Sequence, residues 1–544
     1  MSSYDIIFVL PYPFSDHPSF PEGILKRALE LEGFRVGVIE RPFWQDKASF
    51  GILGRPELFF AVITGPVDSV VLNYTSLRKR RREDLYQFDG KAFFEGYPPS
   101  IKYKIRPDRA VVVFANRIKA LFREVPIIIG GVEASLRRFA HYDFQQEKIR
   151  RSILLDARAD ILVTGMGEKQ VVHIARMLRD GHSVQSLDLP GTARIAKELP
   201  ARDGFRELPS LDQILQDGHR LLEARLIQEK AGIEGTRIVQ GQGDRYVVQE
   251  PARDYDASDL EHIYNQPYTR THPGTRQLTP ALRMNLFSIT SHRGCGGGCA
   301  FCAIGEHEGK RIISRSRESI LKEIRALSGH REWKGIISDI GGASADLYGN
   351  DCRKRQCDRV SCLYPEECPR SFHGKAYLDL LRACRKMKET RKVFVGSGLR
   401  YDRLLKEPEL LEEIMVHHSG RFLRIAPEHT EGHVLELMRK PPFETLEAFV
   451  RLFQRINRSL NRRIELAPYL ILGHPGETRR DVSAMKEKLR ALGLRVTDVQ
   501  VFTPTPGTLS TAMYVAGCSS AFHPVPVERR VKELAERKDL LTRF

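Results

Sequence analysis

The first 294 residues of this 544-residue chain contain no cysteine, because all nine cysteines lie at or after Cys295. An odd and clustered set argues against a disulfide framework and indicates metal binding in a reducing compartment. The chain also lacks the roughly 18-residue apolar run that a membrane-spanning helix needs. Its start, MSSYDIIFVLPYPF, has no basic leader and only a short apolar stretch, so the sequence predicts a cytoplasmic protein without a membrane partner.

Acidic residues are scarce relative to basic ones, with 69 Asp and Glu against 86 Lys and Arg, or a net charge of +17. Such a surplus suits phosphate contacts, so nucleic acid is one alternative partner. The densest basic stretch, Arg78–Arg82, is followed at once by Glu83 and Asp84, and a solvated surface explains it equally well. No zinc-finger or RNA-recognition signature accompanies it. An apolar content of 41% and a length of 544 residues predict a globular protein of two or three domains.

What is present is a C-x3-C-x2-C motif on a glycine-rich loop, formed by Cys295, Cys299 and Cys302. Thiolates select iron–sulfur clusters, zinc or cuprous copper. A structural zinc wants four closed ligands and a cubane cluster has four iron corners, so three cysteines leave one corner open or need a fourth ligand from elsewhere. An open iron can chelate a small molecule and pass it an electron.

This spacing, with Phe301 directly before the third cysteine, resembles the signature of radical S-adenosylmethionine (SAM) enzymes. The surrounding SHRGCGGGCAFCAIGEHEGKRIISRSRESI resembles the YgiQ family of radical SAM proteins, and the likeness covers most of the chain. It extends to HPSF near Phe20, GGVEASLRRFAHYD from Gly130, RSILLDARADILVTGMGE from Arg151 and RIAPEHT from Arg424. The resemblance implies a [4Fe-4S] enzyme that cleaves SAM reductively to a 5′-deoxyadenosyl radical, which abstracts hydrogen from a substrate. It also implies an electron donor such as a flavodoxin or ferredoxin.

Residues 1–200 are predicted to form a Rossmann-like α/β domain with a parallel sheet. Short β-branched runs alternate with helical patterns such as Glu22–Leu31, which is typical of strands buried on both faces. The predicted strands are Asp5–Leu10, Arg35–Ile39, Pro126–Ile129 and Asp160–Val163. By resemblance this is a cobalamin-binding-type domain.

Cobalamin itself is not expected to have a protein ligand. Families that ligate cobalt use an Asp-x-His-x-x-Gly motif after the first strand, but here Asp16 and His17 are adjacent and Gly23 comes too late. Either the vitamin is held without a protein ligand or the fold has kept its shape and lost the cofactor. We favour the second alternative, as a fold-level analogy.

The rest of the chain is predicted as a connector over 201–280, a partial (βα)6 TIM-type barrel over 281–515 with a cysteine-rich insertion at 350–370, and a helical segment over 516–544. Strand and helix patterns alternate through the barrel region, which would place reactive residues at the carboxyl ends of strands. The predicted strands are Leu286–Ile289, Gly335–Ser338, Val393–Gly396, Phe422–Ile425, Ala467–Leu472 and Val499–Phe502. The predicted helices are Glu318–Leu327, Ala376–Lys388, Glu407–His417, Thr445–Leu460 and Arg479–Leu492.

Residues at these strand ends are the candidates for binding SAM. The segment Gly341-Gly342 resembles the motif whose backbone carbonyls meet the SAM ammonium, although Ala343-Ser344 replaces the usual Pro-Thr. Ser397 would hydrogen-bond a ribose hydroxyl, and Arg400 would pair with a carboxylate unless it forms a surface ion pair. The remaining candidates, which would lie near adenine or substrate, are Glu428, Gly473 and Phe301. Packing of the loop is the alternative role of Phe301.

A second group, Cys352-x4-Cys357-x4-Cys362-x5-Cys368, offers four more thiolates. An auxiliary iron–sulfur cluster or a zinc would each be satisfied by this number, and reduced cysteines without metal are the third alternative. The basic residues Arg353, Lys354, Arg355 and Arg359 would offset the negative charge of such a centre, and we favour iron.

Two other functions compete with a radical enzyme. A methylthiotransferase-like modifier would carry a second cluster in its N-terminal domain, where this chain has no cysteine. A non-catalytic iron–sulfur or nucleic-acid-binding protein is the other alternative, and turnover of SAM separates it from an enzyme. The residues point to no particular substrate, oligomeric state or acid–base pair, and His292, His307 and Tyr348 are expected to be structural.

Overall fold

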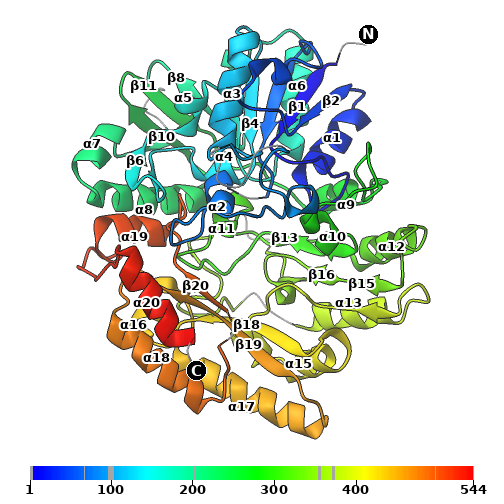
Figure 1. Cartoon of the computed structure of the whole chain (residues 1–544), viewed down its shortest axis with the longest axis vertical. Coiled ribbons are helices and arrows are strands. Elements are labelled where there is room, and N and C mark those ends of the chain that lie inside the picture. The colour runs from blue at the N-terminus through cyan, green and yellow to red at the C-terminus, as the bar shows by residue number, and fades with distance from the viewer. Residues whose placement is uncertain are drawn as a thin grey trace.

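The computed structural model describes residues 4–66, 68–95, 103–199, 204–352, 357–369, 374–496 and 498–542. It is an α/β protein in which an N-terminal half, built on one large sheet, lies against a C-terminal half of parallel strands and helices (Figure 1). Among the described residues, no helix combines the length and apolarity needed to cross a membrane.

The N-terminal sheet has nine strands in the order β2-β1-β3-β4-β7-β8-β11-β10-β9. Their bounds are β1 Ile6–Leu10, β2 Val36–Glu40, β3 Phe59–Ile63, β4 Ile127–Gly130, β7 Ile161–Val163, β8 Thr192–Ala196, β9 Phe205–Leu208, β10 Arg237–Gln242 and β11 Arg245–Gln249. The four predicted strands are present, but β3 was missed although it is fully buried.

The predicted strands pair in parallel, in the order β2-β1-β3-β4-β7, but the sheet as a whole is mixed, because β8 pairs antiparallel with both β7 and β11. Strands β10 and β11 are joined by the two-residue turn Gly243-Asp244, and so short a connection forces an antiparallel pair. Strands β9–β11 come from the segment predicted as a connector and extend the N-terminal sheet. The boundary at residue 200 remains a prediction.

Strand β1 shows why the strands of the N-terminal half are continuous apolar runs in the sequence. Ile7 and Val9 pack on one face with Phe114 of α3 (Ala110–Leu121), and Ile6 and Phe8 pack on the other with Leu29 of α1. Both faces are therefore covered by helices, so every residue of the strand is buried. Helix α1 (Pro21–Leu31) closely matches the prediction and lies beside α6 (Glu168–Arg179).

The C-terminal half carries strands β12 Ser288–Thr290, β15 Ile336–Ile337, β16 Asp339–Gly341, β17 Lys392–Val393, β18 Phe422–Glu428, β19 Glu465–Leu472 and β20 Asp498–Val501. All pair in parallel, as β12–β16, β15–β17 and β18–β19–β20, and a parallel bridge joins Leu399 to Ile425. Each predicted strand overlaps one of them. Between the strands run the predicted helices, as α12 Arg317–Leu327, α13 Lys375–Arg385, α15 Pro408–Glu413, α17 Phe443–Ser459 and α18 Arg479–Ala491; a π-helical turn at Ile414–His418 continues α15.

Shorter elements complete the fold. The helices are α2 Ser69–Asn73, α4 Val132–Leu136, α5 Ile153–Ala157, α7 Leu211–Gln216, α8 His219–Glu234, α9 Ala257–Tyr264, α10 Pro280–Asn285, α11 Ile304–His307, α14 Tyr401–Leu404, α16 Gly432–Met438, α19 Leu509–Ala516 and α20 Val531–Thr542. The hairpin strands are β5 His141–Asp143 with β6 Lys148–Arg150, and β13 His292–Arg293 with β14 Ile313–Ser314. Single 3-10 turns lie at Lys47–Phe50, Phe88–Gly90, Val184–Ser186 and Ala345–Leu347.

Largely buried ion pairs join the two halves. Arg293 Nη1 lies 2.6 Å from Glu168 Oε1, and Arg439 donates to both carboxylate oxygens of Glu229 at 2.8 and 2.9 Å. Removing one partner of such a pair would leave the remaining charge uncompensated and only partly reached by water. The halves therefore hold each other in a fixed relation.

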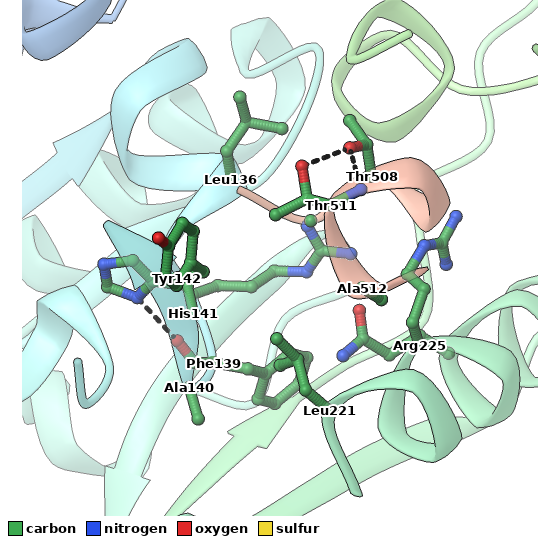
Figure 2. Close-up of a pocket in the computed structure, with 13 residues that line it drawn as sticks. Leu136, Phe139, Ala140, His141, Tyr142, Leu221, Arg225, Thr508, Thr511 and Ala512 are labelled. Atoms are coloured by element: carbon green, nitrogen blue, oxygen red, sulfur yellow. Dashed lines mark hydrogen bonds between the residues drawn. The ribbon is translucent and has the colours of Figure 1, made fainter. Parts of the chain in front are cut away.

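A small cavity at this junction lies between the β5 hairpin, α8 and α19 (Figure 2). Its accessible volume is about 20 Å³, which is room for about one water. On its walls His141 Nδ1 is 3.0 Å from the Phe139 carbonyl, and Thr508 Oγ1 donates to Thr511 Oγ1 at 2.9 Å (Figure 2). Burial lowers the pKa of His141 to about 3 and keeps it neutral. This space belongs to the packing of the two halves.

Candidate active site and metal centres

The first cysteine group lies on the loop that joins β13 to β14, between the two halves of the molecule (Figure 1). The loop opens at Gly294, whose φ of +82° favours glycine. A Cβ at this position would lie 1.9 Å from the Arg311 carbonyl oxygen, so the two ends of the loop can close only around glycine. The predicted glycine-rich loop is thus a closed turn fixed by strand pairing.

The sulfurs of this loop turn toward a common space. A Cβ placed on Gly297 would lie 3.4 Å from Cys295 Sγ, 3.8 Å from Cys299 Sγ and 3.2 Å from Arg400 Nη1. Two thiolate donors and a cation therefore surround the same short stretch of backbone. This cradle fits a group held by thiolates.

Burial shifts the acidity of two of these thiols. Desolvation, followed by the neighbouring Cys299, raises the pKa of Cys295 to about 11 and that of Cys302 to about 12. Neither would ionise near neutral pH without a positive partner. A bound metal supplies that charge, so metal binding would release protons from this site.

No three His, Cys, Asp or Glu side chains among the described residues converge closely enough to hold a single metal ion. Thiolates around one tetrahedral zinc would lie about 3.8 Å from one another. A cluster with iron at four corners is larger and accepts more widely spaced ligands.

Arg400 lies beside the loop that carries Cys295, Cys299 and Cys302. Its Nη1 is 3.9 Å from Cys299 Sγ, while Nη2 and Nε donate to the two carboxylate oxygens of Asp402 at 2.7 and 3.1 Å. Burial disfavours its charge, but the Asp402 carboxylate and Cys299 outweigh burial and raise its pKa. Arg400 thus forms an ion pair, and that pair is buried beside the cluster loop.

The glycine pair and Ser397 meet at the ends of β16 and β17. A Cβ on Gly341 would lie 2.4 Å from Ser397 Oγ, so only glycine leaves room there. The Gly341 carbonyl already accepts from the Ser291 backbone at 2.7 Å. Ser397 donates its hydroxyl to Asp339, whose other oxygen accepts from the Gly396 amide at 2.8 Å. The Ser397 hydroxyl therefore has a protein partner already.

Glu428 ends β18 in a left-handed conformation, with φ of +67°, next to a register shift in the strand. Burial raises the pKa of its carboxyl, against the opposing charges of Lys440 and Arg400. Lys440 Nζ lies 3.8 Å from Glu428 Oε1. Glu428 is thus a buried carboxyl close to the cluster loop.

Two of the residues predicted to lie near adenine or substrate, Phe301 and Gly473, pack against other parts of the protein. Phe301 packs, half-buried, against the hydrophobic core of the N-terminal half. Gly473 is covered by the C-terminal helix, because a Cβ there would lie 2.5 Å from Leu534 Cδ2. Their contacts with adenine remain predictions.

The second cysteine group faces the same cavity as the first. This cavity has an accessible volume of about 650 Å³, and its walls include the sulfur-bearing residues of both groups together with Gly165 and Tyr255 from the N-terminal half. Cys352, Cys357, Cys362 and Cys368 are all half-buried, and no disulfide links any of the described cysteines. Arg353, Lys354 and Arg355 fall outside the described residues, as does part of the predicted insertion 350–370.

Three residues that were predicted to be structural are His292, His307 and Tyr348. Burial lowers the pKa of His292 and of His307 to about 4, so both are neutral. His307 Nδ1 lies 3.0 Å from Ser135 Oγ, and Tyr348 donates to the Arg315 carbonyl at 3.0 Å. His292 and Tyr348 are buried, whereas His307 is half-buried and lines the large cavity.

Asp16 and His17 are engaged elsewhere. Asp16 accepts from Arg27 at 2.6 Å and from Thr269, and His17 Nε2 lies 3.0 Å from Arg270 Nη1. Neither residue lines the large cavity.

Sequence reasoning missed several neighbours of the site. Asp402 pairs with Arg400, Asp339 holds the β17 end, and Ser361 anchors the second cysteine segment. Asp339 could have been found, because it directly precedes the Ile340-Gly341 strand end. Ser361 carried no local signal.

The chain matches two family descriptions that divide it almost end to end. Residues 1–288 match Radical SAM N-terminal, and residues 289–489 match Radical SAM superfamily. A UPF0313 protein of Geobacter sulfurreducens is 42% identical, covering 99% of this chain and 89% of its own length. One from Methanocella arvoryzae is also 42% identical, covering 97% and 88%.

Among solved structures, the radical SAM methyltransferase TsrM of Kitasatospora setae, with cobalamin and a [4Fe-4S] cluster bound, superposes with a TM-score of 0.52. The two share 18% identity, and the match covers 93% of this chain and 77% of TsrM. At this identity the likeness concerns the fold alone.

Proposed function

Because the chain belongs to the UPF0313 family of radical SAM enzymes, we propose that Cys295, Cys299 and Cys302 hold its [4Fe-4S] cluster and that SAM binds beside Arg400. The family assignment agrees with the resemblance to YgiQ proteins. A radical SAM enzyme needs a reductant and a substrate. The observation that carries the proposal is the cradle around Gly297, where two cysteine sulfurs and the Arg400 guanidinium face one another.

When bound, the cluster supplies the single electron that cleaves SAM to methionine and a 5′-deoxyadenosyl radical. The protein binds and orients the cofactor. Arg400 is neutralised by Asp402 on one edge, and its Nη1 is directed at the cysteine loop, where it would pair with the SAM carboxylate. The Gly341 carbonyl accepts from Ser291, so the neighbouring Gly342 carbonyl would accept from the SAM ammonium.

Ser397 and Glu428 complete the proposed SAM site. The Ser397 hydroxyl, held by Asp339, is placed to accept from a ribose hydroxyl while it donates to the carboxylate. Glu428, buried near Lys440, offers a carboxyl to adenine or substrate. Glu428 and Lys440 are buried, whereas Ser397 is half-buried.

The finer architecture belongs to the same proposal. We propose an open (βα)6 barrel over 281–515, preceded by a Rossmann-like domain over 1–200 and the segment 201–280, and followed by the helical segment 516–544. The in-order parallel pairing of β12 to β20 supports it. The protein acts in the cytoplasm, where a flavodoxin or ferredoxin reduces it, and its net charge of +17 leaves a nucleic-acid substrate open to test.

The test is anaerobic reconstitution with iron and sulfide, followed by SAM and a strong reductant, with 5′-deoxyadenosine measured by mass spectrometry. Wild type is expected to form it and Cys299→Ala to form none. Cys384→Ala, which alters a buried cysteine on α13 in the C-terminal core, is the matched control and should keep the activity. An intact cluster without product would contradict the proposal and favour a non-catalytic iron–sulfur or nucleic-acid-binding role.

A further inference from the structure

We propose that Cys352, Cys357, Cys362 and Cys368 ligate a second iron–sulfur cluster, in the same cavity as the first. The inference goes beyond SAM cleavage and does not depend on it. It starts from placement, since all four of these cysteines, separated by up to 16 positions in the sequence, line one cavity.

The second segment is fastened directly to the first cysteine loop. The Cys362 amide donates to the Gly296 carbonyl at 2.8 Å, and the fully buried Ser361 donates to the Gly297 carbonyl at 2.7 Å. Ser361 Oγ also accepts from the Leu363 and Tyr364 amides, at 3.0 Å each. The position of Cys362 is therefore set by the loop that carries Cys295 and Cys299.

The chain then turns back so that a second thiol joins Cys362. The Cys368 amide donates to the Cys362 carbonyl at 2.8 Å, which closes a loop of backbone between these two cysteines. Cys352 and Cys357 line the same cavity as these two cysteines.

The charge around the group suits thiolates. Lys310, from the first cysteine loop, donates to the Arg359 carbonyl, and its positive charge acts on Cys362. Arg359 Nε donates to the Ser361 carbonyl oxygen at 3.2 Å. Two cations thus stand beside four sulfurs and offset the negative charge that a thiolate-ligated centre carries.

The spacing favours a cluster over zinc. Structural zinc sites usually take their cysteines in closely spaced pairs, whereas these are separated by four or five intervening residues along an irregular segment. Four cysteines satisfy all the corners of a [4Fe-4S] cluster. A cluster closed in this way has no open iron, so it does not bind SAM and differs chemically from the first.

The experiment measures metal on the full chain. The variant Cys295→Ala/Cys299→Ala/Cys302→Ala is reconstituted anaerobically with ferrous iron and sulfide, and separately exposed to zinc. Wild type should bind about eight irons per chain and the triple variant about four, with equal sulfide. After reduction, the electron paramagnetic resonance signal of the triple variant should not change when SAM is added, whereas part of the wild-type signal should.

Cys362→Ala and Cys368→Ala, made singly in the wild-type background, should each lose about half of the iron and keep the SAM-sensitive signal. Cys384→Ala should keep all of the wild-type iron. Each variant is compared by circular dichroism, so that loss of metal is read only on folded protein. A triple variant with no iron, one that binds one zinc with no iron, or a Cys362→Ala variant that loses the SAM-sensitive signal would each overturn the proposal.

Discussion

The two cysteine segments of this protein are held in different ways. Cys295, Cys299 and Cys302 lie on a loop whose ends are paired as β13 and β14 and which contains the short helix α11. The described residues between 352 and 368 include no helix or strand, and the segment is attached by hydrogen bonds to the first loop. The first site is thus built by the fold, and the second is built on the first.

This difference predicts an order of dependence. A change that opens the first loop should disturb both segments, whereas a change in the second should leave SAM cleavage largely intact. The predictions that follow test this order, beginning with the largest effect.

Gly294→Ala should abolish the first site. The added Cβ would lie 1.9 Å from a backbone oxygen at a φ of +82°, and relieving that strain would cost about 3 kcal/mol or more. We expect 5′-deoxyadenosine formation to fall more than about 100-fold, a loss of roughly 2.7 kcal/mol of transition-state stabilisation. Gly305→Ala in the same loop has open space around the new methyl group and should stay close to wild type. Equal activity of the two variants would contradict the closed-turn description.

Arg400→Ala should weaken SAM use by about 100-fold in kcat/KM, since it removes the carboxylate partner and leaves Asp402 buried without a cation. Arg400→Lys keeps the charge but loses the planar two-donor geometry of arginine, so its kcat/KM should lie between that of wild type and that of Arg400→Ala. The exposed pair of Arg421 with Glu465 supplies the control Arg421→Ala. Steady-state kinetics in SAM, with thermal melting beside them, separate binding from folding. A lowered melting temperature at unchanged kcat/KM would reduce Arg400 to a structural ion pair.

Ser361→Ala should act mainly on the second segment. It removes the bond to the Gly297 carbonyl and leaves two amides without an acceptor, which costs about 1–3 kcal/mol of local stability. Iron content should drop toward that of the first site alone, while 5′-deoxyadenosine formation changes by less than about threefold. Ser328→Ala at the end of α12 is the matched surface control. If 5′-deoxyadenosine formation is lost while the iron content stays at the wild-type level, the predicted order of dependence is wrong.

His307 gives the smallest effect, on pH dependence. Its pKa of about 4 in the folded chain lies below the usual 6.5, because of burial and then the charges of Arg293 and Arg138. Between these values the unfolded chain binds a proton that the folded chain does not, so stability falls as pH drops from 6.5 toward 4. From pH 6.5 to 5 the cost is about 2 kcal/mol.

His307→Asn should flatten the pH dependence of denaturant unfolding over that range. His219→Asn, on the exposed face of α8, should not. An unchanged slope in His307→Asn would show that other groups govern acid sensitivity.

Much of this fold could be predicted from local pattern, because strands such as β1 and β4 are short apolar runs and α1 is preceded and followed by clear breaks. The three-cysteine site was equally local, since its ligands lie within eight residues. Strand β3 was missed although its apolar run is followed by Thr64 and Gly65, much as β7 is followed by Thr164 and Gly165. The antiparallel extension depended on a two-residue turn whose importance appears only once its strands are paired.

Other features could not be read locally. Some contacts join segments about 60 residues apart or more. Leu534 covers Gly473 in this way, and Ser361 donates to the Gly297 carbonyl. Arg400 was identified by its position after a strand, but its pairing with Asp402 and its distance from Cys299 required the assembled site. Tertiary packing decided these roles.

The ion pairs of Arg293 with Glu168 and of Arg439 with Glu229 cross the boundary between the two matched family segments. A gene fragment encoding either segment alone would expose buried charges and would lose the wall of the cavity that the other supplies. Recombination that exchanged one segment for a distant relative's would carry the same penalty unless both partners travelled together. A substitution at one partner of either pair is therefore expected to need a matching substitution in the other segment.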